Sequence, residues 1–375
     1  MAKFITVIIS CLLLATACNN QGTTLETADL SKINNNTSEA KDLHPVSLPA
    51  LMQKQFNGRD LALGKVLDDN SAYTRYYITY KSGSLTISGI MNIPKGTPPI
   101  GGSSTGSEPD GWPVLFLNHG HIDTSVYTNG RGLRREQDYF ARHGFAVLHS
   151  DYRNHAESDD DPNSENNFRL GYTEDVINAV LAVQNSKLDS LSKTKFGMLG
   201  HSMGGGITQN VLVVKPGLIK AAVLYASVSP RQSDNFERWT LGRRQVSERI
   251  MTTYPAPGEE VCNGLVEGIN QKYPTQPDYL INVQTWCAGE KNLEFWDNLS
   301  AENFFERISE PMLYFHGDKD DSVPFEWSQK SLKNLKDLNK NVSLIEYRGQ
   351  PHEFTPPTWN IFMNKSAEFF KQNLK

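Results

Sequence analysis

The sequence predicts a mixed α/β domain built on a doubly wound, mostly parallel sheet. Short, unbroken apolar runs recur along the chain, as expected of strands that are covered on both faces. Stretches with helical patterning lie between most of these runs. The composition, 38% hydrophobic and 21% charged, is that of an ordinary globular protein, and 375 residues suffice for one large domain. Alternating strands and helices of this kind form right-handed crossovers, which gather functional residues at the carboxyl ends of the strands.

The elements can be assigned in chain order. A hairpin opens the domain, with strands at 76–80 and 85–91 around a turn at 81–84. Six core strands are expected after it, at 114–117, 145–148, 196–199, 221–225, 312–315 and 342–345. Helices are expected at 133–143, 173–185, 205–214, 325–338 and 358–373.

One segment interrupts this alternation. Residues 229–309 lie between the fourth and fifth core strands, contain no strong strand pattern and hold several aromatic residues. We interpret this segment as an inserted, mainly helical cap over the site; the alternative is a surface excursion without a functional role. Trp239, Phe295 and Trp296 are candidates either for lining a substrate pocket or for the cap's own core.

The N-terminus has the pattern of an export signal. Lys3 precedes an apolar run at 4–14, and the small residues 15–17 precede Cys18. This arrangement resembles a bacterial lipoprotein signal, which implies that Cys18 is lipidated; a plain secretory signal is the alternative. We expect a signal peptide at 1–17, a flexible polar tether at 18–45 and the domain at 46–375. The protein would then be anchored by its lipid in the cell envelope, at an outer membrane or the cell surface, or otherwise secreted.

Export affects the interpretation of the cysteines. Cys11 leaves with the signal and Cys18 carries the lipid, so Cys262 and Cys287 remain as a candidate disulfide or as two buried thiols. The net charge of −5 includes no basic run, so we expect no nucleic-acid partner. Neither CxxC nor HExxH occurs, and no tract is rich in histidine, so we expect no metal and no cofactor.

The motif that carries chemistry is Gly200-His201-Ser202-Met203-Gly204, which fits G-x-S-x-G. It follows an expected strand and precedes an expected helix, which is the context of a nucleophile elbow. The flanking glycines allow a tight turn, and the helix dipole favours negative charge at the serine. We therefore predict that Ser202 is a nucleophile; the alternative is a glycine-rich turn with an inert serine.

A nucleophilic serine needs a base and an orienting acid later in the chain. His352 follows the last core strand and is the candidate base. Asp318, Asp320 and Asp321 follow the fifth core strand and compete for the role of the acid. Spacing alone leaves these three carboxylates open.

The stretch 316–324 resembles the H-G-x-x-D-x-x-V-P motif of prolyl-oligopeptidase-like and dienelactone-hydrolase-like members of the α/β-hydrolase superfamily. This resemblance implies an α/β-hydrolase fold and assigns the acid to Asp320. Asp318 and Asp321 would be loop or helix N-cap carboxylates. The family places its general base on the loop that holds His352.

The family pattern also implies an oxyanion hole. One donor would be the backbone N–H of Met203, after the nucleophile. The stretch 118–122 resembles the family's H-G-x-x loop, so His121 would give a second backbone N–H while Gly120 allows close approach. Residues 151–158 resemble the D-x-R-G-x-G-x-S loop, with Asn154 and Ala156 in place of glycines, so a different loop shape is expected.

Together these residues predict a serine hydrolase that acts without a cofactor through an acyl-enzyme. The substrate would be a carboxylic ester or a small amide or peptide, as in a carboxylesterase. A prolyl-oligopeptidase-like serine peptidase is the alternative. A non-catalytic binding protein and a cofactorless lyase on the same fold are further alternatives.

Overall fold

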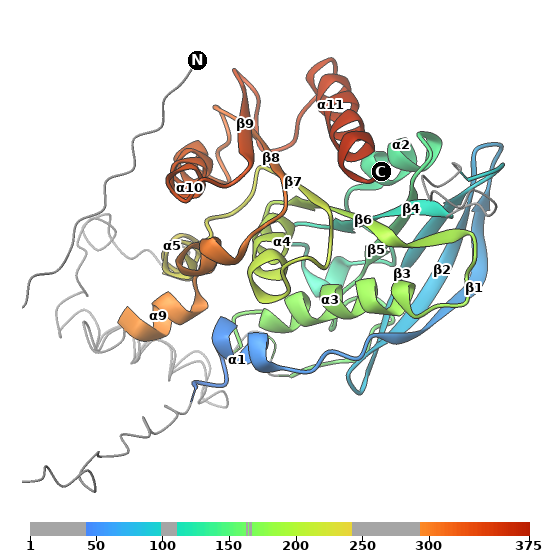
Figure 1. Ribbon diagram of the computed structural model, residues 1–375, viewed down its shortest axis with the longest axis horizontal. Coiled ribbons are helices and arrows are strands. Elements are labelled where there is room, and N and C mark those ends of the chain that lie inside the picture. Colours follow the sequence, from blue (N-terminus) through green and yellow to red (C-terminus); the bar gives the residue numbers. More distant parts are fainter. Residues whose placement is uncertain (1–42, 99–110, 163, 165–166, 242–292) are drawn as a thin grey trace, which may run out of the picture. The chain divides into compact units, whose positions relative to one another are not determined.

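The computed structural model describes residues 43–98, 111–162, 164, 167–241 and 293–375. At its centre lies a nine-stranded sheet with the order β1-β2-β3-β5-β4-β6-β7-β8-β9 (Figure 1). Its strands are β1 (Arg59–Asp69), β2 (Tyr73–Ser82), β3 (Leu85–Pro94), β4 (Trp112–Asn118), β5 (Ala146–Ser150), β6 (Leu191–His201), β7 (Ala221–Tyr225), β8 (Met312–Gly317) and β9 (Val342–Tyr347). The pairs β1–β2, β2–β3 and β3–β5 are antiparallel, and every later pair is parallel.

Helices cover both faces of this sheet, and each face has its own hydrophobic core. One core joins the sheet to α3 (Leu170–Gln184), α4 (Met203–Val214) and α10 (Phe325–Asp337). The opposite core joins it to α2 (Arg134–Arg142) and α11 (Thr358–Asn373), which lie side by side (Figure 1). The predicted doubly wound α/β architecture is therefore confirmed.

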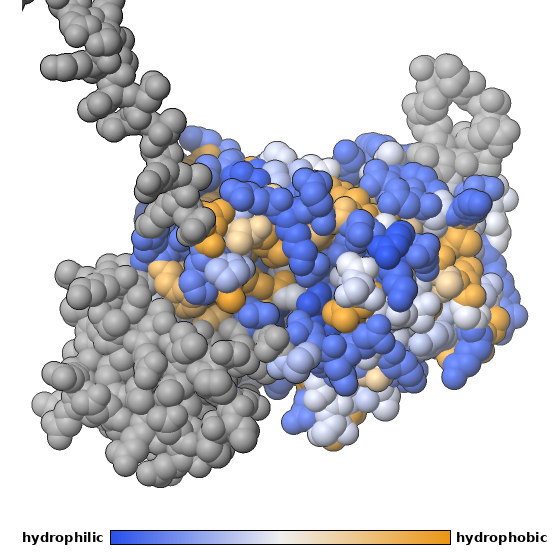
Figure 2. Space-filling view, turned by 90° about the horizontal axis from the view of Figure 1, so that it is seen from below, coloured by the Kyte–Doolittle hydropathy of each residue, from blue (hydrophilic) through white to orange (hydrophobic). Residues whose placement is uncertain are grey.

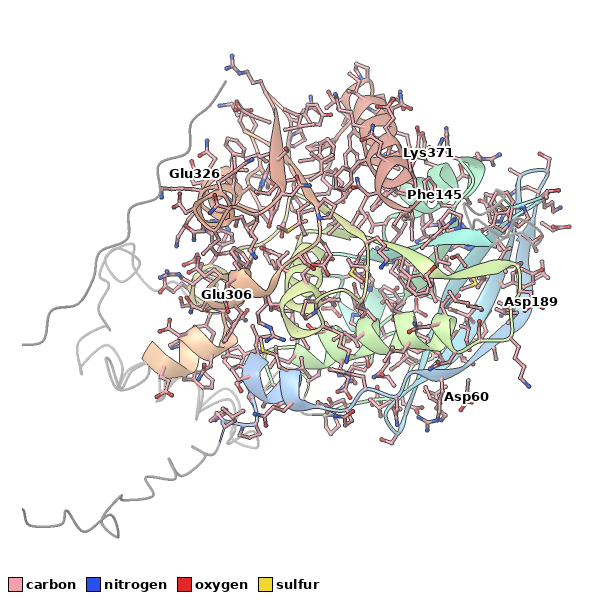
Figure 3. All side chains as sticks on the ribbon, viewed as in Figure 1. Asp60, Phe145, Asp189, Glu306, Glu326 and Lys371 are labelled. Carbon is pink, nitrogen blue, oxygen red and sulfur yellow. The ribbon has the colours of Figure 1, made fainter. Side chains whose placement is uncertain are left out.

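Apolar aromatic side chains are buried in the cores, whereas many charged side chains are exposed. Phe145 is 2% exposed and packs against Phe140 and Phe370. Figure 3 shows it among the elements of the domain, whereas Asp60 and Glu326, which are exposed, lie at the edge of the view. The face seen in Figure 2 is mainly hydrophilic, with hydrophobic residues scattered over it.

The expected elements agree closely with the observed ones. The opening hairpin is confirmed, with Ser82 paired with Leu85 across its turn. All six core strands are present, and β7 and α11 coincide with the ranges predicted for them. Three elements were not predicted: β1, the 3₁₀ turn η2 (Thr124–Val126) and the short helix α1 (Leu48–Gln53). Ser47 caps α1 by accepting a hydrogen bond from the Ala50 amide.

The chain between β7 and β8 has only helical elements in its described parts. These elements are α5 (Gln232–Asn235), the π-helical turn η3 (Phe236–Leu241), α9 (Leu293–Leu299) and the 3₁₀ segment η6 (Ala301–Arg307). Trp296 is 4% exposed and packs against Phe168 and Phe236. It therefore belongs to the hydrophobic core that includes α3, α4 and α10. Trp239 meets the ring of Trp327 edge-on at 5.7 Å.

Several predictions fall on parts of the chain outside the described residues. Cys18, Cys262 and Cys287 lie there, as do the signal and most of the tether. Within the described ranges, no helix has the length and apolar character needed to cross a membrane.

Candidate active site

Ser202 lies at the junction between β6 and α4, as the motif predicts. Its backbone has φ +55° and ψ −122°, a strained conformation for a residue with a side chain. Its amide donates to the carbonyl of Tyr225 at 3.0 Å, and its own carbonyl accepts from the amide of Gly205 at 2.9 Å. The neighbouring strand and the first turn of the helix therefore hold the strained turn in place.

The glycines of the motif are required by close packing. A Cβ atom on Gly200 would lie 2.2 Å from the carbonyl oxygen of Gly204. A Cβ atom on Gly204 would lie 2.0 Å from the carbonyl oxygen of Asn118, at the end of β4. Because real Cβ contacts are much longer, Gly200 is required for the first turn of α4 to pack against β6, and Gly204 is required for the elbow to fit against β4.

Asp320 lies in contact with His352. Its Oδ2 accepts from His352 Nδ1 at 2.7 Å, and its side chain is fully buried. Its Oδ1 accepts from the backbone amides of Ser322 at 2.9 Å and Val323 at 2.8 Å. The structure thus places the carboxylate where it can orient the imidazole.

A second histidine, His316, approaches the same carboxylate from β8. Its Nε2 lies 3.0 Å from Asp320 Oδ2, and its Nδ1 lies 2.7 Å from the hydroxyl of Ser328. Burial raises the pKa of Asp320, but the hydrogen bonds from His316 and His352 outweigh burial and hold that pKa well below its usual value. The carboxylate therefore stays charged. His316 is the first residue of the H-G-x-x-D motif, but the motif alone does not indicate this contact.

Asp318 and Asp321, the other two candidates for the acid, form hydrogen bonds within the loops. Asp318 Oδ1 accepts from the backbone amide of Gly349 at 2.5 Å, which ties the acid loop to the loop that carries His352. Asp321 accepts from the hydroxyl of Ser322 at 3.3 Å. The residue at the N-cap of α10 is Pro324, without a side-chain cap, so the helix-cap alternative for Asp318 and Asp321 is wrong and both are loop carboxylates.

The His352 loop packs against the nucleophile elbow. The rings of His352 and His201 lie 4.6 Å apart, and His201 Nε2 lies 3.4 Å from the carbonyl oxygen of His352. The His352 side chain is 18% exposed. Among the described contacts, the Ser202 hydroxyl forms no hydrogen bond with His352. Such bonds are commonly long in ligand-free enzymes and shorten when substrate binds.

The predicted oxyanion loop also reaches the elbow. A Cβ atom on Gly120 would lie 3.1 Å from Ser202 Cβ, so the backbone here approaches the nucleophile closely. Arg169, which the sequence analysis missed, lies beside both proposed donors: its Nη1 is 3.3 Å from His121 Nδ1 and 3.4 Å from Met203 Sδ. Arg169 has φ +59°, immediately before α3, and no sequence motif marks it.

The loop after β5 has a left-handed backbone at the two positions where the D-x-R-G-x-G-x-S pattern has glycines. Asn154 and Ala156 have φ +65° and +50°, so both adopt the conformation that glycine favours. Between them and β5, Arg153 is buried and its Nη2 lies 2.7 Å from Asp175. A buried ion pair between Arg153 and Asp175 therefore anchors this loop to α3.

Two other histidines near the site are buried. Burial lowers the pKa of His119 to about 3 and that of His201 to about 3. Both stay neutral at ordinary pH, so neither is suited to collect a proton from Ser202. Among the described residues, no group of three or more His, Cys, Asp or Glu side chains is placed to hold a metal ion.

Comparison with known proteins identifies the family. Residues 113–354 match the model of the alpha/beta hydrolase fold family, and the chain therefore belongs to that family. A curated relative, a non-heme chloroperoxidase of Streptomyces lividans, is 27% identical over 259 residues, which cover 65% of this chain and 86% of that protein.

Solved structures share the fold. Acetyl xylan esterase 1 from Thermoanaerobacterium sp. superimposes with a TM-score of 0.55 and 14% identity, covering 86% of this chain and 92% of that one. An acylaminoacyl peptidase of Pyrococcus horikoshii gives a TM-score of 0.56 and 18% identity, covering 81% of this chain and 42% of that one. At these identities the likeness concerns the fold alone.

Proposed function

We propose that this protein is a serine hydrolase in which Ser202, His352 and Asp320 form a catalytic triad. The observation that carries the proposal is the arrangement of three loops at the carboxyl ends of β6, β8 and β9. A strained serine, a histidine and a charged, buried aspartate lie on these loops, and the last two are in contact at 2.7 Å. These are the groups that acyl transfer to a serine requires.

The reaction would proceed in two steps. His352 Nε2 takes the proton of the Ser202 hydroxyl while Oγ attacks the substrate carbonyl, and Asp320 stabilises the imidazolium that forms. The C–O or C–N bond of the leaving group then breaks as His352 returns the proton to it. A water molecule repeats the sequence on the acyl-enzyme, which releases the acid and free Ser202.

The negative charge on the carbonyl oxygen would be stabilised by backbone N–H groups. Met203 supplies one at the first turn of α4, and His121 supplies the second from the loop that Gly120 brings close to Ser202. Each donor of this kind contributes on the order of 3 kcal/mol to transition-state stabilisation.

We propose a carboxylic ester or a small amide as the substrate. Acetyl xylan esterase 1 is matched over 92% of its chain, whereas the acylaminoacyl peptidase is matched over only 42%. The shared architecture spans that whole esterase, and we therefore put ester hydrolysis first. A prolyl-oligopeptidase-like peptidase activity is the alternative.

The chloroperoxidase relative supports a second candidate activity. If hydrogen peroxide replaces water as the acyl acceptor, the acyl-enzyme yields a peroxyacid, which is an oxidant. Halogenation that requires hydrogen peroxide and a carboxylic acid, and that disappears in Ser202→Ala, would support this activity. Halogenation that persists in Ser202→Ala would contradict it.

We propose that the enzyme works outside the cytoplasm. The segment 1–17 would be removed, Cys18 would carry a lipid and the polar residues up to 45 would tether the domain to a membrane of the cell envelope. In that oxidising setting Cys262 and Cys287 would form a disulfide. Mass spectrometry of the mature protein tests both modifications.

A fluorophosphonate probe tests the central proposal. Unmodified protein should acquire one adduct, located on Ser202 by peptide mapping, and Ser202→Ala should acquire none. Ser71→Ala is the matched control, because Ser71 is exposed in the turn between β1 and β2. A folded protein without an adduct would exclude the hydrolase. A panel of acyl esters and aminoacyl amides then separates esterase from peptidase activity.

A further inference from the structure

A polar cleft lies away from Ser202, between the β1–β2 hairpin and α2. It has a volume of about 740 Å³ and includes Lys65, Arg75, Tyr77, Arg134 and Glu157 in its lining. This volume is in the range of pockets that hold small organic molecules. None of Ser202, Asp320 and His352 lines it.

The guanidinium of Arg75 forms an unusual part of this cleft. The side chain belongs to β2 and the residue is only 8% exposed. Its Nη1 donates to the neutral oxygens of Gln137 at 2.8 Å and Asn92 at 3.5 Å. No described carboxylate lies within ion-pair distance of Arg75. The carboxylates of Asp151 and Asp68 act on this charge from beyond ion-pair distance and offset part of the lowering of the Arg75 pKa that burial causes. A buried arginine is normally in direct contact with an anion, and no described residue supplies that contact here.

Two further cations face the same space. Arg134, the first residue of α2, and Lys65 on β1 are exposed, and neither has an ion pair among the described residues. Burial, followed by the nearby charge of Arg134, lowers the pKa of Arg75. Asp138, a carboxylate of the lining, is already bound to Arg142 Nε at 3.0 and 2.9 Å. The three cations outnumber Asp68 and Glu157, the two carboxylates of the lining without an ion pair among the described residues, so the cleft favours an anionic group.

Other lining groups suit hydroxyls. The phenol of Tyr77 has no hydrogen bond among the described residues and can donate or accept. The carboxylates of Asp68 and Glu157 can accept from hydroxyl groups. A bare inorganic anion would engage the cations and leave these groups and most of the volume unused.

We propose that this cleft binds a hydroxylated small molecule with one anionic group, which is the chemistry of an acidic sugar. The anionic group would lie on the guanidinium groups of Arg75 and Arg134 with Lys65 near it. The hydroxyls would bind to Tyr77, Asp68 and Glu157. This site is separate from the proposed triad, and it does not depend on the reaction at Ser202.

Calorimetric titration of the full chain tests this proposal with four probes: glucuronic acid, glucose 6-phosphate, glucose and inorganic phosphate. At least one anionic sugar should bind about tenfold or more tightly than both glucose and inorganic phosphate. The comparison of glucuronic acid with glucose 6-phosphate shows whether a carboxylate or a phosphate is preferred, and either preference supports the proposal.

Variants locate the site. Arg134→Gln and Lys65→Gln remove exposed charges, so the fold is preserved, and each should weaken binding of the anionic sugar by about tenfold. Arg134→Lys should restore part of that loss. Lys333→Gln, an exposed position on α10, is the matched control and should bind as the unmodified protein does.

Four results would overturn the proposal. The first is that glucose binds as tightly as the anionic sugars, and the second is that inorganic phosphate does so. The third is that neither anionic sugar binds below about 10 mM. The fourth is that the anionic sugar binds both Arg134→Gln and Lys65→Gln as it binds the unmodified protein.

Discussion

Replacing Asp320 by asparagine changes the charge and the hydrogen-bonding pattern of one fully buried side chain and leaves its size unchanged. Asp320 Oδ1 accepts from two backbone amides, and Oδ2 faces His352 Nδ1 at 2.7 Å. The asparagine oxygen can keep the two amides, which places its NH₂ group opposite His352. An NH₂ group donates and cannot accept there, so Nδ1 becomes the acceptor and the proton moves to Nε2. In that tautomer His352 cannot take the proton of Ser202.

The expected loss of activity is large. A wrong tautomer combined with the lost charge reduces kcat on the order of 10⁴-fold, or about 5.4 kcal/mol, with little change in KM. Hydrolysis of p-nitrophenyl acetate by Asp320→Asn measures it, and a thermal melt confirms folding. Asp318→Asn keeps an acceptor for the Gly349 amide, so its loss should stay below about threefold.

Asparagine variants of the neighbouring Asp318 and Asp321 provide the comparison that could refute the assignment of Asp320 as the acid. Asp321 is exposed, and among the described contacts its side chain bonds only to Ser322, so Asp321→Asn should have nearly full activity. If Asp320→Asn keeps activity within about tenfold of the unmodified protein while Asp318→Asn or Asp321→Asn loses it, the assignment of the acid is wrong.

The remaining predictions concern stability. Gly204→Ala places a Cβ atom 2.0 Å from a main-chain carbonyl oxygen and should lower stability by about 3 kcal/mol or more, measured by urea unfolding. Arg153→Met leaves the buried carboxylate of Asp175 without its cation and should cost about 3–5 kcal/mol, whereas Arg348→Met, 89% exposed, should cost under about 0.5 kcal/mol. The pKa of His119 is lowered to about 3 in the folded protein, so its contribution to stability is complete above pH ~6.5 and is lost as the pH falls from there towards 3. His119→Gln should therefore reduce the fall in unfolding free energy over that range.

Each stability prediction has a contradicting result. An unchanged urea midpoint in Gly204→Ala would show that the elbow has room for a side chain. Equal losses in Arg153→Met and Arg348→Met would show that burial of the ion pair does not matter. An identical pH slope in His119→Gln would show that His119 is not kept neutral by the fold.

The sequence predicted the sheet well because its central strands are buried on both faces. Runs such as those in β4 and β7 carry an unbroken apolar signal that local reading can detect. β1 lacks that signal: most of its residues are exposed, and its pairing with β2 shifts register three times. The position of β1 at the edge of the sheet therefore depends on its pairing with β2 more than on an apolar pattern in its own residues.

The site was predictable to the extent that chain order and motif spacing specify it. Ser202, Asp320 and His352 each follow a core strand, and parallel strands bring their carboxyl ends to one edge. Arg169 and His316 could not be assigned in this way, because their importance arises from contacts with residues distant in sequence or from a carboxylate shared with the base. The left-handed φ of Ala156 was also unpredictable, because alanine rarely adopts that conformation.

The hydrogen bond from Gly349 to Asp318 has a consequence for how such an enzyme can diversify. It joins the acid loop to the base loop, and both loops extend from neighbouring strands whose pairing continues to Gly317 and Tyr347. The acid–base pair is thus assembled by β8 and β9 themselves. The chain between β7 and β8 contacts the acid loop as well, because Arg238 of η3 donates to the carbonyl oxygens of Asp321 and Ser322. Changes in that chain can therefore act on the acid loop while β8 and β9 keep the acid and the base together.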